Sequence, residues 1–394
     1  MTDPTWQWPS FTEEEADAVR RVVLSNRVNY WTGEETRAFE REFADWCGTR
    51  HAVALANGTV ALEIALRALG IGPSDEVIVT PRTFIASTSC VTMVGATPVF
   101  ADIDRDSGNI TAETIARVTT AKTKAILCVH LAGWPCDMPA IMSLATDRGL
   151  KVIEDCAQAH GARIDGRMVG SFGDIGAWSF CQDKIMTTGG EGGMVTTDDE
   201  RLWRAMWEFK DHGKSWSAVY ERDHAPGFRW LHESFGSNYR MIETQAVIGR
   251  IQLGRMAGWQ AKRAANAHAI WSTARLIPGL RAPEIPENFT HAAYKAYVYL
   301  DPEALRTGWD RDRVMAEMNT AGVPCFSGSC SEIYLERAFD GTPWRPTERL
   351  PVARELGETS LMFLVHPTLS PQALEQALGA LRAVMARAVR AAGE

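Results

Sequence analysis

Lys184 lies between an apolar stretch and a glycine-rich loop, in the sequence Ser179-Phe-Cys-Gln-Asp-Lys-Ile-Met-Thr-Thr-Gly-Gly-Glu-Gly-Gly193. A lysine amine forms Schiff bases with aldehydes, including that of pyridoxal 5′-phosphate (PLP). The glycines after it let the backbone approach a ligand closely. A single lysine is more often a surface charge, so Lys184 indicates a PLP site only together with other motifs.

Asp155 ends a second apolar stretch, in Val152-Ile-Glu-Asp-Cys-Ala-Gln-Ala-His160. A carboxylate at the end of a parallel strand faces the edge of the sheet where ligands bind. An ionised aspartate there can hold a proton on the nitrogen of a pyridine ring, and the protonated ring attracts electrons from a carbanion. Helix N-capping is an equally open alternative for an aspartate.

A third candidate site is Asn57-Gly58-Thr59, which separates a strand-like run from a helical pattern. Free N–H groups and the positive end of a helix suit a phosphate. The Ser179 hydroxyl, five residues before Lys184, could bind the same phosphate. Taken alone, a plain turn with a threonine cap is the more frequent explanation of such a tripeptide.

The elements that must position these residues alternate between strands and helices from about residue 51 to 197. Apolar runs of strand length alternate with helical patterns such as Val60–Leu69, which predicts βαβ units and a mostly parallel sheet. The predicted strands are His51–Leu55, Glu76–Thr80, Thr97–Ala101, Lys124–His130, Lys151–Asp155, Ile175–Phe180 and Gly193–Thr197. We therefore predict an α/β fold with helices flanking the sheet.

The rest of the chain predicts a second, smaller α/β domain. A long helix is expected from about Tyr239 to Trp259, followed by a strand at Tyr294–Leu300 and helices at Arg311–Ala321 and from about Pro371 to 392. We place a large domain at 1–259, including the N-terminal segment, and a small domain at 260–394.

Composition limits the classes of function. The 394 residues are 45% hydrophobic and 23% charged, which is typical of a globular protein and not of a disordered one. The formal net charge of −8 argues against a nucleic-acid binder. No signal peptide or membrane span is recognisable, so we expect a cytoplasmic protein with reduced cysteines and no membrane partner.

Together and in this order, the three signals resemble the DegT/DnrJ/StrS family of sugar aminotransferases, which adopt the fold-type-I PLP fold. The likeness runs from about Val28 to Leu253. Its strongest stretches are Asn57–Leu62, Val79–Ala86, Val152–Ala162, Gly170–Met194 and Gly236–Leu253.

The resemblance implies a role for each cofactor residue. Lys184 would bind PLP covalently and move the proton during catalysis, and Asp155 would pair with the pyridine nitrogen. The remaining implied contacts are Gln158 near the ring and its hydroxyl, Phe84 on the ring face, and Gly58, Thr59 and Ser179 at the phosphate. No metal is expected.

Family members work as dimers with shared sites, so the resemblance implies a homodimer. Asn238, or as the alternative Arg240, would reach the phosphate of the neighbouring subunit. Asn238 could instead be the N-cap of the helix that follows it. The implied reaction moves an amino group from a donor, expected to be glutamate, to a keto sugar, expected to be a nucleotide-linked 4-keto-6-deoxy hexose.

Substrate contacts are less well defined. His160, His212 and His366 are candidates, although a structural histidine is the more frequent case for each. The loop Gly189-Gly190-Glu191 is one residue longer than the commonest family form. The stretch Pro324–Tyr334 has serine and cysteine where many members carry a histidine.

Other interpretations stay open. A PLP-dependent sugar dehydratase would carry histidine in place of Lys184, whereas a lyase or a non-enzymatic regulator of the same fold would not be distinguished by that residue. We expect no added DNA-binding segment at either end, which would argue against the regulator. The EF-hand-like spacing from Asp102 to Glu113 and the glycines at 170, 173 and 176 lack the context of a calcium loop or a dinucleotide fingerprint.

Overall fold

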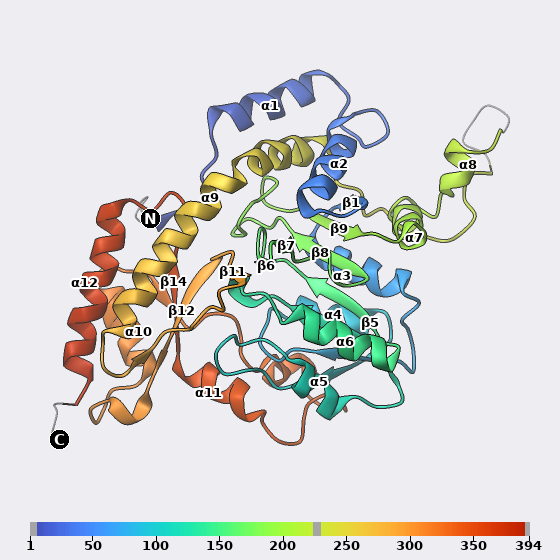
Figure 1. Ribbon diagram of the computed structural model, residues 1–394. Helices are drawn as coiled ribbons and strands as arrows, with labels where there is room; N and C mark the ends of the chain where they lie inside the picture. The colour runs from blue at the N-terminus through green and yellow to red at the C-terminus, as the bar shows by residue number, and fades with distance from the viewer. Residues whose placement is uncertain (1–5, 224–229, 391–394) are drawn as a thin grey trace.

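The computed structural model describes residues 6–223 and 230–390. Its centre is a seven-stranded sheet in the order β1-β9-β8-β5-β4-β2-β3 (Figure 1). These strands are β1 (His51–Leu55), β2 (Glu76–Val79), β3 (Thr97–Phe100), β4 (Thr123–Val129), β5 (Lys151–Asp155), β8 (Ile175–Ser179) and β9 (Gly193–Thr197). Each of the seven predicted strands is confirmed, with ends that differ by at most one residue.

The sheet is mostly parallel, as predicted. Strands β8, β5, β4, β2 and β3 pair in parallel, and β9 runs antiparallel to both of its neighbours, β1 and β8. Successive side chains of a strand point to opposite faces. In β4, Ala125 and Leu127 enter one core and Ile126 and Cys128 the other. Both faces are therefore buried, which explains the continuous apolar runs.

Helices cover both faces of the sheet. Helices α3 (Gly58–Ala68), α4 (Ala86–Met93) and α7 (Glu200–Lys210) belong to one side, and α2 (Glu35–Cys47), α5 (Ala112–Val118) and α6 (Met138–Arg148) to the other. The short helix α8 (Trp216–Tyr220) projects beyond α7, away from the body (Figure 1). A small sheet joins β6 (Arg163–Ile164), β7 (Arg167–Met168) and β11 (Phe289–Thr290).

Helix α9 is longer than the sequence pattern indicated. It spans Glu243–Arg275, 33 residues, and packs against α1 (Glu13–Leu24) and α2 at one end. At its other end it contacts the C-terminal part of the chain. The predicted helix at Tyr239–Trp259 is therefore wrong at both ends. The division into domains at residues 259 and 260 stays a prediction, and α9 continues through that position without a break.

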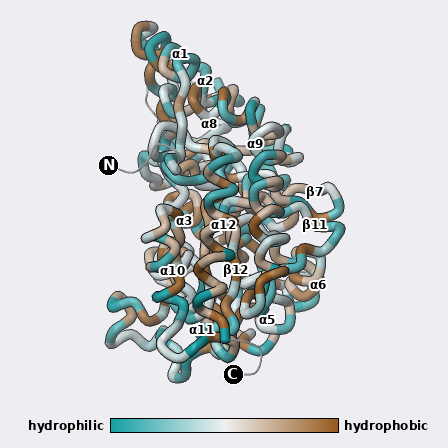
Figure 2. The backbone as a smooth tube through the Cα atoms, turned by 90° about the vertical axis from the view of Figure 1, so that its left-hand side faces the viewer, coloured by the Kyte–Doolittle hydropathy of each residue, from teal (hydrophilic) through white to brown (hydrophobic). Residues whose placement is uncertain are grey.

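The C-terminal part is a four-stranded antiparallel sheet with its own core. The strands are β10 (Leu280–Arg281), β12 (Lys295–Leu300), β13 (Cys325–Phe326) and β14 (Ser360–Leu364), and the helices are α10 (Arg311–Thr320), α11 (Pro351–Thr359) and α12 (Pro371–Ala388). Figure 2 shows hydrophobic stretches around β12 and α12 and hydrophilic ones towards the outer loops. The predicted strand and the two predicted helices are confirmed apart from their ends.

None of the helices in the described ranges combines the length and the apolar run needed to cross a bilayer. All eight cysteines are free.

Candidate active site

A cavity of about 880 Å³ opens at the carboxyl ends of β5 and β8. Parallel strands direct ligands to this edge, because the loops that follow them meet there. The cavity brings together seven of the residues selected from the sequence, namely Gly58, Thr59, Phe84, Asp155, Gln158, Ser179 and Lys184. These residues come from four separate segments of the chain.

Lys184 is reached from β8 by a short turn in which its N–H donates to the Cys181 carbonyl at 3.1 Å. Its own carbonyl accepts a hydrogen bond from the indole of Trp8 at 2.6 Å. The Lys184 Nζ lies 5.4 Å from the centre of the Tyr294 ring. The hydroxyl of Tyr294 in turn donates to Asp183. Both backbone groups of Lys184, its N–H and its carbonyl, are therefore hydrogen-bonded, which fixes the position from which the side chain extends.

Asp155 is the last residue of β5, and its side chain is buried. One carboxylate oxygen accepts from the Ser87 hydroxyl at 2.8 Å and the other from the Ala157 N–H at 3.1 Å. Burial raises the pKa of Asp155, while these two donors and the Lys184 ammonium lower it. A positively charged ring nitrogen would favour the ionised form further. Since no helix begins after Asp155, the N-cap alternative is wrong.

The third candidate segment forms a cradle at the start of α3. The Asn57 side chain, and not a threonine, caps this helix by accepting from the Val60 N–H at 3.0 Å. The first N–H groups of a helix lack intrahelical acceptors, so those of Gly58 and Thr59 remain available at the cavity. A Cβ on Gly58 would lie 2.6 Å from the Cβ of Ser179, so only glycine permits this approach.

Gln158 and Phe84 line the same cavity as Asp155. The Gln158 side-chain oxygen accepts from the Ala132 N–H at 2.8 Å, which fixes the amide at the cavity wall. Phe84 is 67% exposed although it is a large apolar residue. A planar aromatic ligand could cover such a ring. The cavity thus offers an amine for the aldehyde of PLP and a buried carboxylate for its ring nitrogen. It also offers a cradle of N–H groups for the phosphate and an exposed aromatic side chain for the face of the ring.

Other residues of the cavity were missed by sequence reasoning. Ser87 holds Asp155, but a serine on a helix carries no recognisable signal. Tyr294 and Lys295 enter the cavity from the C-terminal part of the chain. The strand beginning at Tyr294 was recognised, and a lysine next to an otherwise apolar strand was the available clue to a role in the site.

The structure does not bring the three histidines to the described lining of the cavity. His160 is buried between the rings of Trp178 and Phe180, and burial lowers its pKa to about 3. His366 is buried against Trp8, with its ring centroid 6.1 Å from that of the indole. His212 is exposed in a turn with φ of 62°.

Asn238 and Arg240 also lie apart from the described cavity lining. Asn238 is exposed and pairs with Asp211 through an isolated β-bridge. Because α9 begins only at Glu243, the alternative that Asn238 caps it is wrong. Arg240 forms an ion pair with the same Asp211 at 2.6 Å.

Comparison with known proteins places the chain in one family. The model of the DegT/DnrJ/EryC1/StrS aminotransferase family matches residues 9–382. The chain is 37% identical over 361 residues to the UDP-N-acetyl-3-dehydro-alpha-D-glucosamine 3-aminotransferase of Acidithiobacillus ferrooxidans, covering 90% of each chain. It is 36% identical over 379 residues to the GDP-perosamine synthase of Caulobacter vibrioides, covering 93% of this chain and 95% of the other.

A solved structure gives the same result in three dimensions. The aminotransferase from Psychrobacter cryohalolentis superimposes with a TM-score of 0.95 and 63% identity, over 96% of this chain and 98% of the other. The chain therefore belongs to the DegT/DnrJ/EryC1/StrS aminotransferase family and is an aminotransferase that uses PLP.

Proposed function

We propose that this aminotransferase adds an amino group to a keto sugar carried on a nucleotide, with glutamate as the donor and a 4-keto-6-deoxy hexose as the sugar. The observation on which the proposal rests is that Lys184 and Asp155 line the same cavity. Its volume of about 880 Å³ leaves room for a substrate beside the cofactor. Relatives named for UDP- and GDP-linked sugars support the substrate class.

The residues of the chain divide the work among them. When bound, PLP accepts the amino group from the donor and passes it to the ketone. Lys184 holds the cofactor at rest, and its freed amine moves the proton at the substrate carbon. Asp155 keeps the ring nitrogen protonated. Gly58, Thr59 and Ser179 hold the phosphate, Gln158 lies beside the ring hydroxyl, and Phe84 covers the ring face.

Lys295 supplies a cation for the anionic part of a substrate. Among the described residues that line the cavity, Lys184 and Lys295 are the cationic ones. The nearby carboxylate of Asp183 accepts from the Tyr294 hydroxyl. Once Lys184 is bound to the cofactor, Lys295 is the remaining positive charge of this lining. Both the carboxylates of an amino donor and the diphosphate of a sugar nucleotide would bind such a charge.

Substitution Lys295→Met should raise the KM of one substrate about tenfold or more, the effect of losing a charged hydrogen bond. A higher KM for glutamate assigns Lys295 to the donor carboxylate, and a higher KM for the nucleotide sugar assigns it to the diphosphate. Lys295→Arg is the matched control and should keep most of the affinity. Unchanged KM values for both substrates would contradict the assignment.

The same assignment predicts a pH dependence. Burial lowers the pKa of Lys295 to about 8, assisted by the charges of Arg263 and Lys184 and opposed by Asp183. The ammonium is therefore present below about pH 8 and lost above it. The affected KM should rise above that pH in the wild type and stay level in Lys295→Met.

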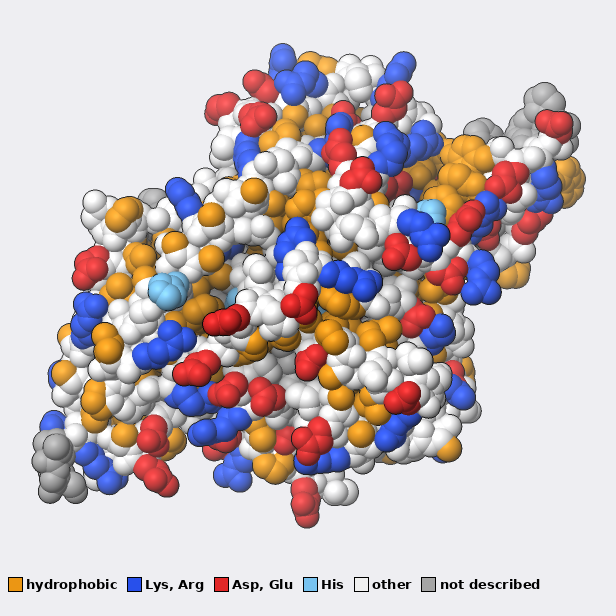
Figure 3. All heavy atoms as spheres, in the orientation of Figure 1, with side chains coloured by type: hydrophobic (Ala, Val, Ile, Leu, Met, Phe, Trp, Pro, Cys, Tyr) orange, Lys and Arg blue, Asp and Glu red, His pale blue; other side chains and the backbone are white. Residues whose placement is uncertain are grey.

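We also propose a homodimer with shared sites. The arm, defined as residues 211–223 and 230–240, includes α8 and carries exposed aromatic side chains. Trp230 is 87% exposed and Phe235 is fully exposed. Figure 3 shows hydrophobic side chains gathered at the base of this arm around α8. Exposed aromatic residues on a projecting segment are typical of an interface. Asn238 lies on this arm and would reach the phosphate of the partner subunit.

Subunit complementation tests the shared site. Asn238→Ala should weaken cofactor retention, and Lys184→Ala should be inactive. Mixed dimers of the two variants should recover part of the activity, because one of their two sites carries neither lesion. The test needs Asn238→Ala homodimers that are clearly impaired. Without recovery in confirmed mixed dimers, each subunit must build its site alone.

The substrate itself is tested by incubating the protein with glutamate and a panel of nucleotide-linked keto sugars, followed by mass spectrometry. The expected result is a product with an amino group in place of the ketone oxygen. If the donor converts the bound cofactor but no sugar is aminated, the substrate class is wrong.

A further inference from the structure

The glycine loop Gly170-Ser-Phe-Gly173 binds an anion that belongs to the protein itself. The Glu154 carboxylate accepts from the N–H groups of Phe172 and Gly173 with one oxygen, at 2.7 Å each. Its other oxygen accepts from the Gly170 N–H at 2.8 Å. Successive N–H groups around a concave loop are a common device for binding phosphates. Here the ligand is a fully buried glutamate of β5.

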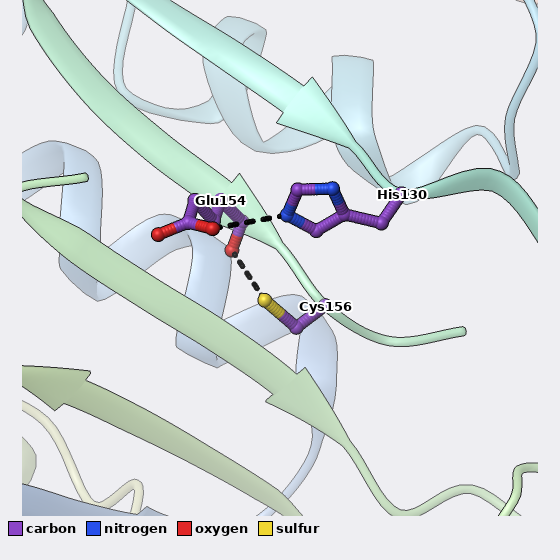
Figure 4. Close-up of side chains that lie close together, drawn as sticks. All are labelled: His130, Glu154 and Cys156. Atoms are coloured by element: carbon purple, nitrogen blue, oxygen red, sulfur yellow. Dashed lines mark hydrogen bonds and ion pairs between the residues drawn. The ribbon is translucent and has the colours of Figure 1, made fainter. Parts of the chain in front are cut away.

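His130 supplies the fourth donor (Figure 4). Its Nδ1 accepts from the Cys136 N–H at 2.9 Å, so the proton of the neutral ring lies on Nε2. That nitrogen is 3.1 Å from the second oxygen of Glu154 and donates to it. The His130 N–H also donates to the Asp155 carbonyl at 3.2 Å. Both oxygens of Glu154 thus accept two hydrogen bonds each.

His130, Glu154 and Cys156 lie close enough to hold a metal ion, but their hydrogen bonds argue against one. All four acceptor positions of the glutamate are occupied. The Cys156 thiol donates to the Glu154 carbonyl at 3.6 Å, and burial raises its pKa well above the usual range. A metal would need the thiolate and a free carboxylate oxygen. The cluster is therefore a hydrogen-bonded network.

The glycines are required by this arrangement. Gly170 has φ of 81°, and a Cβ there would lie 2.3 Å from the Trp178 ring. A Cβ on Gly173 would lie 2.7 Å from the Val152 carbonyl oxygen. The loop can therefore close around Glu154 only with glycine at both positions. This gives a physical reason for the glycine spacing that resembles a dinucleotide fingerprint.

We propose that Glu154 and His130 are positioning residues that fix Asp155 relative to Lys184. Glu154 and Asp155 are neighbours on β5, and their side chains leave the strand on opposite faces. The loop held by Glu154 leads directly into β8, which ends at Ser179 ahead of Lys184. One buried carboxylate thus joins the ends of β4 and β5 to the start of β8. The proposal rests on the cofactor roles of Asp155 and Lys184 in the proposed function.

Substitution Glu154→Gln tests the proposal, because the amide keeps the shape but turns an N–H₂ group towards N–H donors. The affinity for PLP should fall about 10- to 100-fold, the range for removing a group that orients a ligand in metal sites. The pH midpoint of the absorbance change of the bound cofactor should also rise. If Asp155 holds the proton on the pyridine nitrogen less firmly, the ring withdraws fewer electrons. The nitrogen that links Lys184 to the cofactor then becomes more basic.

Glu243→Gln is the matched control. Glu243 is equally buried, and accepts from the N–H groups of Glu35 and Thr36 at the start of α2, outside the described cavity lining. It should lose thermal stability without a change in the midpoint. His130→Phe keeps a planar ring but has no N–H group, so it removes one donor of four and should shift the midpoint in the same direction by less. If Glu154→Gln does not fold, this milder variant tests the positioning role in its place.

Folded Glu154→Gln and His130→Phe proteins with wild-type midpoints and PLP affinity would overturn the proposal. A stoichiometric metal that is lost in His130→Phe would overturn it as well. Asp155→Asn separates this failure from a failure of the proposed function. If Asp155→Asn changes the midpoint and the two positioning variants do not, Glu154 and His130 are purely structural, while the cofactor site stands.

Discussion

Substitution Lys184→Ala should lower the rate of amino transfer by about 10,000-fold, the upper range for loss of a general base. The reason is that, in the proposed function, one amine both holds the cofactor and moves the proton, and no other described lysine except Lys295 lines the cavity. Steady-state transamination rates measure the effect. Lys184→Arg keeps the charge but should be as inactive, because a guanidinium does not form the covalent link.

Chemical labelling identifies the lysine independently of rate. The purified protein should be yellow, and its absorbance band should shift on addition of glutamate. Borohydride should then attach the cofactor irreversibly to the peptide that contains Lys184. Lys262→Ala, at an exposed position of α9, is the control and should label normally. Label on Lys295 or another lysine would overturn the assignment.

Substitution Asp155→Asn should lower turnover by about 100- to 1000-fold, the range for losing one preorganised electrostatic contact in an active site. The side chain keeps its size, and the Ser87 hydroxyl can still donate to the amide oxygen, while the Ala157 N–H loses its acceptor. Any loss larger than that of this one hydrogen bond therefore reports on the charge that holds the ring proton. Turnover by the variant, compared with its circular dichroism spectrum and melting temperature, separates chemistry from folding.

Asp102→Asn is the control for Asp155→Asn. The Asp102 carboxylate accepts from the N–H groups of Val352 and Ala353 at the start of α11, outside the described cavity lining. The substitution removes one of the two acceptor oxygens, so it should cost about 1 kcal/mol of stability as one lost hydrogen bond and leave turnover unchanged. Wild-type turnover in Asp155→Asn would make Asp155 a structural residue.

The sequence predicted the large sheet well because each strand is a short apolar run bounded by turn residues, and burial on both faces makes such runs continuous. It predicted α9 poorly. The first part of this helix packs on α1 and α2 and the last part on β12 and α12, so the apolar face changes direction along its length. A helix that changes partners shows no single stripe from which its end can be read.

The residues to which we assign the cofactor could be selected from the sequence because each lies at or near the end of a recognisable element. Lys295, Tyr294 and Trp8 were not, because they reach the cavity region through packing between distant segments. The network around Glu154 is a further case. Its residues stand next to Asp155 in the sequence, yet only the course of the backbone shows that the glycine loop closes around a glutamate.

The position of Trp8 has a consequence for synthesis of the protein. Its indole binds the backbone of Lys184 and stacks on His366, so Trp8 needs two partners that lie at very different distances along the chain. At the usual speed of translation, Trp8 and His366 leave the ribosome roughly 20 to 70 s apart. Until His366 emerges, Trp8 has its hydrogen-bond partner at Lys184 but not the ring on which it stacks. A bulky fusion close to Trp8 would therefore impair late maturation of the site more than early folding of the sheet.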